Sequence, residues 1–393
     1  MITQQEAYDT MMKQVCQPAL ESISLDQALD RILAKDIHAD IDMPPFIKSA
    51  MDGYACRRAD LDNPLQMIET IKAGQAPVQT IGKNQCSKIM TGGMVPEGAD
   101  CVITVEETEV LDTDSVCFIA DSTRNNVCLK GEDMRVGDVV LTAGTRLRPQ
   151  HIAMAASVGA VAPTVYCCSR VGIISTGDEL VEPEIKPTLS QIRTSNSHQL
   201  VAQVLSTHAI PTYYGITRDT ETSLDSMLKK AMADNDVILL SGGVSMGEFD
   251  LVPGIMKANG FDILFDEIAI QPGKPTTFAV SPNSYCVGLP GNPVATFTQF
   301  ELLVKPFLYR LMGHDYEPPN IRLPMDSNHT RARARRDGWF PATITREGTV
   351  SPCEFHGSAH VDSLCEADCL VTMPAGVKSL DAGCMVSIHL INP

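Results

Sequence analysis

The pattern of apolar and polar positions changes along the chain and divides it into segments of different character. Apolar residues recur at helical spacing over residues 4–34, which predicts a helical opening that Pro44 and Pro45 interrupt. From about residue 46 to 132, short β-prone runs alternate with Gly, Pro, Asn and Asp clusters; the runs are 68–71, 88–90 and 101–105. This second pattern predicts a small β-rich domain.

The middle of the chain alternates between strand and helix signals. Strands are expected over 171–174, 212–216, 237–240 and 285–287, and helices over 197–206, 222–233 and 296–312. Such alternation predicts a mainly parallel sheet covered by helices. A helix over 149–157 and a short edge strand over 161–166 lead into this region, and short strands follow it beyond the linker at 313–320.

These segments predict an α/β plus β multidomain chain of 393 residues. The expected division is a discontinuous helical and linker domain I (1–45 and 134–165), a β-rich domain II (46–133), an α/β domain III (166–317) and a β-domain IV (318–393). A chain of this length buries enough apolar surface to need no covalent cross-links.

Composition excludes several classes of function. The chain has 31 basic against 48 acidic residues, a formal net charge of -17, which argues against a nucleic-acid partner. No window approaches the roughly 18 continuous apolar residues of a membrane span, and residues 1–14 lack an export signal. The 13 cysteines contain no Cys-x-x-Cys pair, so we expect reduced thiols and a cytoplasmic location. An anionic substrate would need a local basic pocket.

Three strands of the predicted sheet run into small polar turns that contain glycine. Glycine lets the backbone approach a ligand closely, and a following helix start offers free N–H groups to an anion. Because such loops gather at the carboxyl ends of parallel strands, they predict one shared phosphate site. The alternative is that the turns are purely structural helix starts. The candidate substrate-binding residues are Ser175, Thr176, Gly177, Asp178, Gly242, Gly243, Ser245, Pro290 and Asn292.

Carboxylates accompany these turns and suggest a metal. Asp178 and Glu179 lie in the first turn, Asp219 follows the second strand, and Asp250 lies nine residues after Ser241. Mg²⁺ prefers one or two carboxylates together with substrate phosphates, so the group predicts a magnesium site. The alternative is that these acids only stabilise helix N-termini.

Two basic features could hold an oxyanion. Lys274 lies in a constrained loop, Gln-Pro-Gly-Lys-Pro at 271–275, and could neutralise a phosphate or oxyanion as a point charge. Residues 331–336 read Arg-Ala-Arg-Ala-Arg-Arg, and as a strand they would place Arg331, Arg333 and Arg335 on one face. The competing interpretations are an ordinary surface lysine and a charged edge strand.

Seven short motifs together resemble one family, the molybdopterin molybdenumtransferases, which are bacterial relatives of the carboxyl-terminal part of gephyrin. Their order and spacing fit that family over essentially the whole chain. The motifs are SAMDGYA at 49–55, MTG at 90–92, GED at 131–133, STGDEL at 175–180, SGGVSMGEFD at 241–250, PGKP at 272–275 and LPGNPV at 289–294.

The resemblance implies a fold and a reaction. The implied fold is an elongated homodimer whose α/β domain resembles the molybdopterin adenylyltransferases and whose last domain is β-barrel-like. The implied substrates are adenylylated molybdopterin and molybdate, and the reaction uses a divalent metal, releases AMP and leaves molybdenum on the dithiolene sulfurs. Further implied partners are the molybdopterin adenylyltransferase and the apo-molybdoenzymes.

The resemblance also implies roles for individual residues. Ser245 and the Gly242-Gly243 turn would hold the phosphates, and Asp250, Asp219 and Glu179 would position magnesium or the nucleotide. Asp52, Thr91 and Asp133 would reach the same cleft from the partner subunit. The implied molybdate pocket contains Lys274, Pro275, an arginine near Arg336 and a serine near Ser363.

The chain departs from the family pattern at Gln271, where many relatives have a second lysine, and at Thr194 and Lys130. We hypothesise that Arg193 supplies the missing positive charge. Two other functions remain open from the sequence: the adenylyltransferase step itself, and a non-catalytic molybdopterin-binding scaffold that kept the fold.

Overall fold

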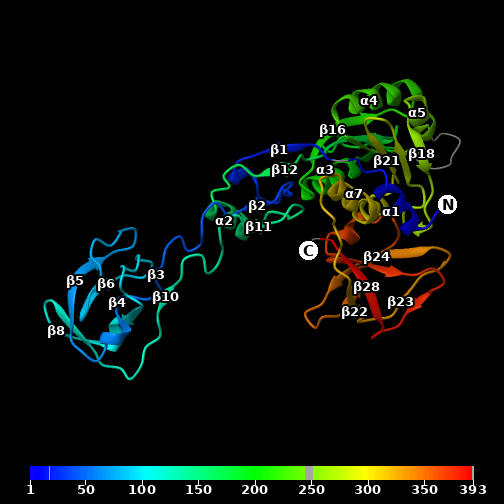
Figure 1. Cartoon of the computed structure of the whole chain (residues 1–393). Coiled ribbons are helices and arrows are strands. Elements are labelled where there is room, and N and C mark those ends of the chain that lie inside the picture. The colour runs from blue at the N-terminus through cyan, green and yellow to red at the C-terminus, as the bar shows by residue number, and fades with distance from the viewer. Residues whose placement is uncertain (17, 244–250, 392–393) are drawn as a thin grey trace.

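The computed structural model describes residues 1–16, 18–243 and 251–391 of the chain, which is elongated (Figure 1). The sheet that contains β4, β5, β6 and β8 lies at one end, and the α/β sheet and the last β-domain lie together at the other. A slender middle part with β2, β11 and α2 connects them. Among the described residues, none of the helices combines the length and the apolar character needed to cross a bilayer.

The α/β region is built on a mixed six-stranded sheet in the order β16-β13-β17-β21-β20-β18. β16, β13, β17 and β21 are parallel, while β20 runs antiparallel to both β21 and β18. The mainly parallel sheet predicted from the sequence is therefore confirmed. The strands are β13 (Arg170–Thr176), β16 (Ile210–Thr217), β17 (Val237–Ser241), β18 (Asp262–Phe265), β20 (Thr277–Val280) and β21 (Tyr285–Leu289).

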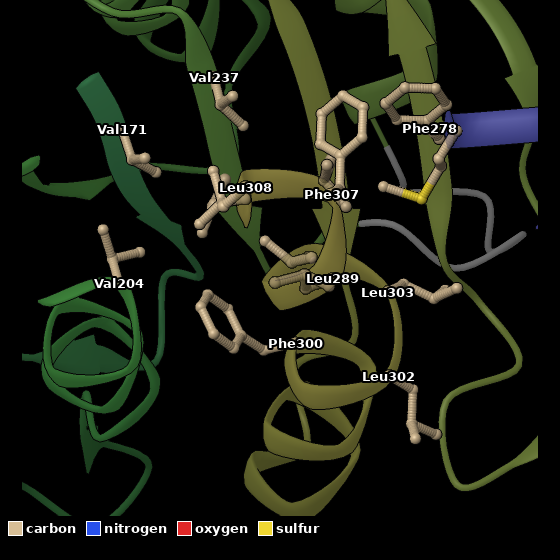
Figure 2. Packing of buried hydrophobic residues seen from close by; sticks show 14 of the residues in the cluster. Val171, Val204, Val237, Phe278, Leu289, Phe300, Leu302, Leu303, Phe307 and Leu308 are labelled. Atoms are coloured by element: carbon tan, nitrogen blue, oxygen red, sulfur yellow. The ribbon is translucent and has the colours of Figure 1, made fainter. Parts of the chain in front are cut away.

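Helices cover both faces of this sheet, and alternate side chains of each strand enter different cores. Ile173 packs into the cluster on one face and Ile174 into the cluster on the other. Figure 2 shows the first cluster, where Val204, Phe300 and Phe307 from the helices lie among Val171 and Val237 of the strands. The first face carries α1 (Gln4–Met12), α3 (Asn196–Ser206), the π-helix η4 (Phe300–Val304) and α7 (Lys305–Leu311), and the second carries α4 (Glu221–Asp234) and α5 (Val252–Ala258).

The predicted helices are only partly correct at two places. The helical opening ends at Met12 instead of continuing to residue 34, and α1 packs with the α/β core. Ala28 and Leu33 belong to a separate core around Leu147 and α2 (Pro149–Ser157), so their spacing reflects a different set of contacts. The long helix predicted over 296–312 is real, but it starts with α6 (Pro293–Gln299) and contains the π-turn of η4.

The residues before β13 form two further parts besides α1: a middle part and a β-rich part. In the middle part, β1 (Leu20–Ser22) pairs with β12 (Thr164–Tyr166) and β2 (Ile37–His38) pairs with β11 (Val139–Leu141). The 3₁₀ helix η1 (Leu25–Gln27) connects β1 to β2.

The β-rich part has a six-stranded sheet, confirming the prediction. Its strands in spatial order are β7 (Cys101–Thr104), β4 (Gly53–Cys56), β6 (Gln85–Ile89), β5 (Leu65–Ile71), β9 (Ser115–Phe118) and β8 (Thr108–Asp112), with β3 (Lys48–Ser49) paired to β10 (Val127–Cys128) and with η2 (Arg58–Asp60) and η3 (Val105–Glu107).

The carboxyl-terminal sheet is barrel-like, as expected. Its order is β19-β24-β26-β28-β22 with β25 on β24, and a bridge between Met325 and Val350 joins the continuation of β22 to β25. β19 comes from the segment just before Lys274, so this sheet directly holds the Lys274 loop. The strands are β19 (Ile270–Gln271), β22 (Ile321–Pro324), β24 (Asp337–Ile344), β25 (Val350–Pro352), β26 (Cys369–Met373) and β28 (Met385–Leu390); β23 (His329–Thr330) pairs with β27 (Ser379–Leu380), and η5 (Val361–Leu364) precedes β26.

Candidate active site

The loops that follow the four parallel strands meet at one edge of the central sheet. In the order β16-β13-β17-β21, the chain changes direction across the sheet between β13 and β17, and ligands of open α/β sheets bind at such a point. The loops line a cleft of about 580 Å³. The predicted site residues that line it are Ser175, Thr176, Gly177, Glu179, Asp219, Gly242, Gly243, Pro275, Pro290 and Asn292.

Glycine is required where two of these loops touch. Gly242 has φ 96°, and a Cβ at this position would lie 2.4 Å from the backbone oxygen of Thr176. Gly243 follows with φ 60°. No L side chain fits at Gly242 without moving the first loop, so the two turns stay in close contact, and the Gly242 N–H donates to the Leu289 carbonyl at 3.2 Å.

Hydroxyl and carboxylate groups are arranged beside the turns. Thr176 Oγ1 donates a hydrogen bond to Asp219 Oδ1, and the Asp219 backbone N–H donates to Asp178 Oδ1 at 3.4 Å. The Glu179 carboxylate lies over Gly177, where a Cβ would be 2.7 Å from Glu179 Oε2. Asp178 supports the Asp219 loop and does not line the cleft.

These carboxylates are hard oxygen donors of the type that Mg²⁺ selects, so the donor chemistry fits. Within residues 1–16, 18–243 and 251–391, however, no group of three acidic, His or Cys side chains is arranged to hold a metal by itself. The predicted residues Ser245 and Asp250 lie outside the described residues. The magnesium site stays a prediction, in which substrate phosphates supply part of the ligand set.

Sequence reasoning missed Asn196, which ties the cleft loops together. Its Nδ2 donates to Ser241 Oγ and to the Gly291 carbonyl, each at 2.8 Å, and the residue is buried. The side chain therefore fixes the end of β17 relative to the 289–293 loop. The only local signal was a polar residue at the start of a predicted helix, which is common at helix starts of every kind.

A second cleft, of about 660 Å³, lies next to the first between the α/β domain and the carboxyl-terminal sheet. Predicted residues Lys274 and Arg336 both line it. Pro275, Pro290, Gly291 and Asn292 line both clefts and form their common wall. The structure thus brings the glycine turns and the predicted oxyanion residues to adjoining spaces.

The predicted arginine stripe is wrong. β23 ends at Thr330 and β24 begins at Asp337, so residues 331–336 form an irregular connection instead of a strand. Arg331 donates to the carbonyls of Val377, Arg336 and Pro374 at 2.8, 2.9 and 2.8 Å. Arg331 is therefore a structural residue whose guanidinium group donates to backbone carbonyls, and the alternating spacing of the arginines does not indicate a strand.

We expect Arg331→Ala to lower the free energy of unfolding by about 2–3 kcal/mol, because it leaves three carbonyls without a charged donor. Urea denaturation followed by circular dichroism would measure the change. Arg333→Ala, at an exposed position of the same connection, is the control and should change stability by less than about 0.5 kcal/mol. Equal effects of the two variants would contradict the structural role of Arg331.

Arg336 is less occupied by hydrogen bonds than Arg331, the other arginine that lines this cleft. It lines the second cleft and uses Nη1 for one hydrogen bond, to the Ile270 carbonyl at 3.0 Å. Arg193, which we expected to supply a missing positive charge beside Lys274, lines the first cleft instead and donates Nε to the Ile185 carbonyl at 3.1 Å. Arg193 therefore does not replace the missing lysine beside Lys274.

The predicted serine near Ser363 also needs a correction. Ser363 is buried, its hydroxyl donates to the His360 carbonyl at 2.6 Å, and it lines neither cleft. Ser358 lines the second cleft, and its Oγ accepts a hydrogen bond from Asn292 Nδ2 at 2.8 Å. The short 3₁₀ helix η5 turns Ser363 inward, which sequence spacing could not reveal.

The three candidate residues of the β-rich domain lie far from both clefts. Asp52 Oδ1 accepts hydrogen bonds from the Thr91 backbone N–H and hydroxyl, both at 2.7 Å, and these bonds lower the pKa of Asp52. Asp133 is exposed. Asp52 directly precedes β4, and Figure 1 shows β4 at the opposite end of the chain from β16 and β21. A single chain does not bring these residues to the α/β cleft.

Comparison with known proteins covers nearly the whole chain. Three family models match it: the MoeA N-terminal region (domain I and II) at residues 2–159, a probable molybdopterin binding domain at 172–310, and the MoeA C-terminal region (domain IV) at 323–391.

Individual relatives agree with these models. A molybdopterin molybdenumtransferase of Staphylococcus epidermidis is 35% identical over 402 residues, covering 99% of this chain and 95% of that protein. The protein of the same name from Staphylococcus aureus strain Mu50 is 35% identical, covering 96% and 92%. The crystal structure of the molybdopterin biosynthesis MoeA protein from Pyrococcus horikosii superposes with a TM-score of 0.86 at 30% identity, covering 100% of this chain and 99% of the other. The chain therefore belongs to the molybdopterin molybdenumtransferase family.

Proposed function

We propose that the chain is a transferase that inserts molybdenum from molybdate into adenylylated molybdopterin and releases AMP. The observation that carries the proposal is the common wall of the two clefts, formed by Pro275 and Pro290–Asn292. One cleft offers glycine turns suited to phosphates, and the other offers Lys274 and Arg336 for an oxyanion. A nucleotide-linked substrate in the first cleft and molybdate in the second would lie side by side, as metal transfer requires.

The chain's own residues supply binding and orientation. The glycine turns after β13 and β17 hold the phosphoanhydride by close approach of their backbone, since no side chain at Gly242 blocks it. Asn196 and Ser358 fix the loops that form the common wall. Lys274 and Arg336 neutralise the tetrahedral molybdate dianion through charge-assisted hydrogen bonds.

Asp219 and Glu179 are the described residues that would hold Mg²⁺ at the phosphate cleft, together with Asp250 as the sequence predicts. When bound, Mg²⁺ supplies charge neutralisation at the phosphate oxygens. Thr176 holds the Asp219 carboxylate by a hydrogen bond and so orients it towards the cleft.

The proposed functional unit is a homodimer. Asp52 and Thr91 form a hydrogen-bonded pair at the far end of the chain, and a second copy would place such a pair, with Asp133, at the cleft. Mixing Asp52→Ala chains with Lys274→Ala chains tests this arrangement, because a mixed dimer would contain one intact site and regain AMP release. We further propose that the chain interacts with the molybdopterin adenylyltransferase and with the apo-molybdoenzymes, and that it is located in the cytoplasm.

The experiment that tests the reaction is AMP release from adenylylated molybdopterin with and without molybdate. We expect release by the intact chain to depend on molybdate, and Lys274→Ala to need at least about tenfold more molybdate because a charged hydrogen bond is lost. Lys83→Ala, at an exposed position of the β-rich domain, is the control and should behave as the unaltered chain.

Two results would replace the proposal. Consumption of ATP with release of pyrophosphate would favour the adenylyltransferase step. Binding of the nucleotide substrate without turnover at any molybdate concentration would favour a scaffold.

A further inference from the structure

The lysine of the second cleft already has an acidic partner. Lys274 Nζ lies 2.5 Å from Glu267 Oε1, and the two side chains are 45% and 20% exposed. Among the described residues, Glu267 is the only acidic side chain within ion-pair distance of Lys274. The carboxylate is therefore placed at the ammonium group that the proposed function assigns to molybdate.

The backbone holds Glu267 at this position. The Ile268 N–H donates to the Lys274 carbonyl at 2.9 Å, which closes the loop between the two residues. Ile2 clamps the outer side, since its N–H donates to the Glu267 carbonyl at 3.1 Å and its carbonyl accepts from the Ala269 N–H at 2.7 Å. The backbone positions from which the two side chains meet are thus fixed by hydrogen bonds of the loop.

The other charges of the cleft make this pair important. Arg331 lines the cleft, but its guanidinium is committed to three carbonyls. Position 271 is a neutral glutamine. Lys274 and Arg336 contribute two positive charges next to the ligand space and Glu267 offsets one of them, so the local surplus is small for a pocket meant to hold a dianion.

We infer that Glu267 is an internal competitor for Lys274 that sets the affinity of the second cleft for tetrahedral dianions. A dianion entering the cleft meets a lysine whose charge is already neutralised and a carboxylate that repels it. Binding then depends on Lys274 turning at least one of its three N–H donors from Glu267 to the ligand. This inference rests on the proposed function, which assigns molybdate to the second cleft.

The test is titration calorimetry of molybdate alone into the full-length chain, without the pterin substrate. Glu267→Gln keeps the size of the side chain and removes its charge, and we expect it to lower the Kd for molybdate about five- to tenfold. Asp266→Asn removes the same charge from the adjacent, exposed position and should change the Kd less than about twofold. Thermal unfolding of each variant would confirm that it is folded.

A second pair of variants shows whether the effect acts through Lys274. In a Lys274→Gln background, the gain from Glu267→Gln should fall below about twofold, since the competing contact is already gone. An unchanged or weaker molybdate affinity in Glu267→Gln would overturn the inference, as would absence of molybdate binding by all variants or a gain that persists without Lys274. AMP release is measured separately, so failure of the inference leaves the test of the proposed reaction intact.

Discussion

Gly242→Ala should lower kcat/KM for AMP release by about a hundredfold or more, since a displaced binding loop costs that much when the reacting groups shift by about 1 Å. The added Cβ would lie 2.4 Å from the Thr176 backbone oxygen, and φ at this position is 96°. Either the turn after β17 or the turn after β13 must move. Because residues of both turns line the phosphate cleft, movement of either turn should displace the groups that bind the phosphates.

A matched control separates the cleft effect from backbone strain. Gly348 also has positive φ, 77°, but a Cβ there meets nothing within 4 Å, and it lies in the turn between β24 and β25. Gly348→Ala should therefore cost about 1–2 kcal/mol of stability and leave kcat/KM unchanged. Similar activity losses in both variants would show that the Gly242 contact with Thr176 is unimportant.

Lys305→Met should lower the free energy of unfolding by about 3–5 kcal/mol, because it leaves a buried carboxylate without its cation. Lys305 Nζ donates to Glu301 Oε2 at 2.8 Å, and both side chains are almost completely buried. Gln203 Nε2 of α3 donates to Glu301 Oε1 at 2.9 Å, and His389 of β28 lies 3.8 Å from Glu301 Oε2. The network ties the α/β domain to the carboxyl-terminal sheet, and the second cleft lies between these two parts.

The chain offers a control with the same spacing. Lys229 and Asp225 form an i, i+4 pair at 2.7 Å on α4, with the lysine 64% exposed. Lys229→Met should cost at most about 0.5 kcal/mol because solvent screens the pair. Urea denaturation at neutral pH would compare the two variants, and equal losses would refute the importance of burial.

The pH dependence of this network has a definite sign. Burial by itself raises the pKa of Glu301, but His389, Lys305 and Gln203 outweigh it and lower the pKa below its ordinary value of 4.5. A carboxyl with a depressed pKa in the folded state stabilises the protein above its ordinary pKa. That stability should disappear as the pH falls below 4.5 through the folded-state pKa, and Lys305→Met should show a smaller acid dependence over this range.

The sequence determined the features that arise from local patterns. Apolar runs and glycine turns specified the central strands, the helices between them and the loops that form the phosphate cleft. These two signals predicted the strands and turns correctly because a strand buried on both faces is apolar throughout, and because a positive φ next to a close backbone contact requires glycine. Helical spacing failed beyond Met12, where apolar residues serve another core.

Only the tertiary structure decided which groups meet. It joined Lys274 to Glu267, buried Ser363 while placing Ser358 at the cleft, and occupied Arg331 with carbonyls. It also placed β4, which Asp52 directly precedes, at the opposite end of the molecule from the α/β sheet. The physical reason is that an ion pair or a hydrogen bond depends on the distance between side chains in space, and in irregular segments such as 331–336 the sequence pattern does not show the direction in which each side chain points.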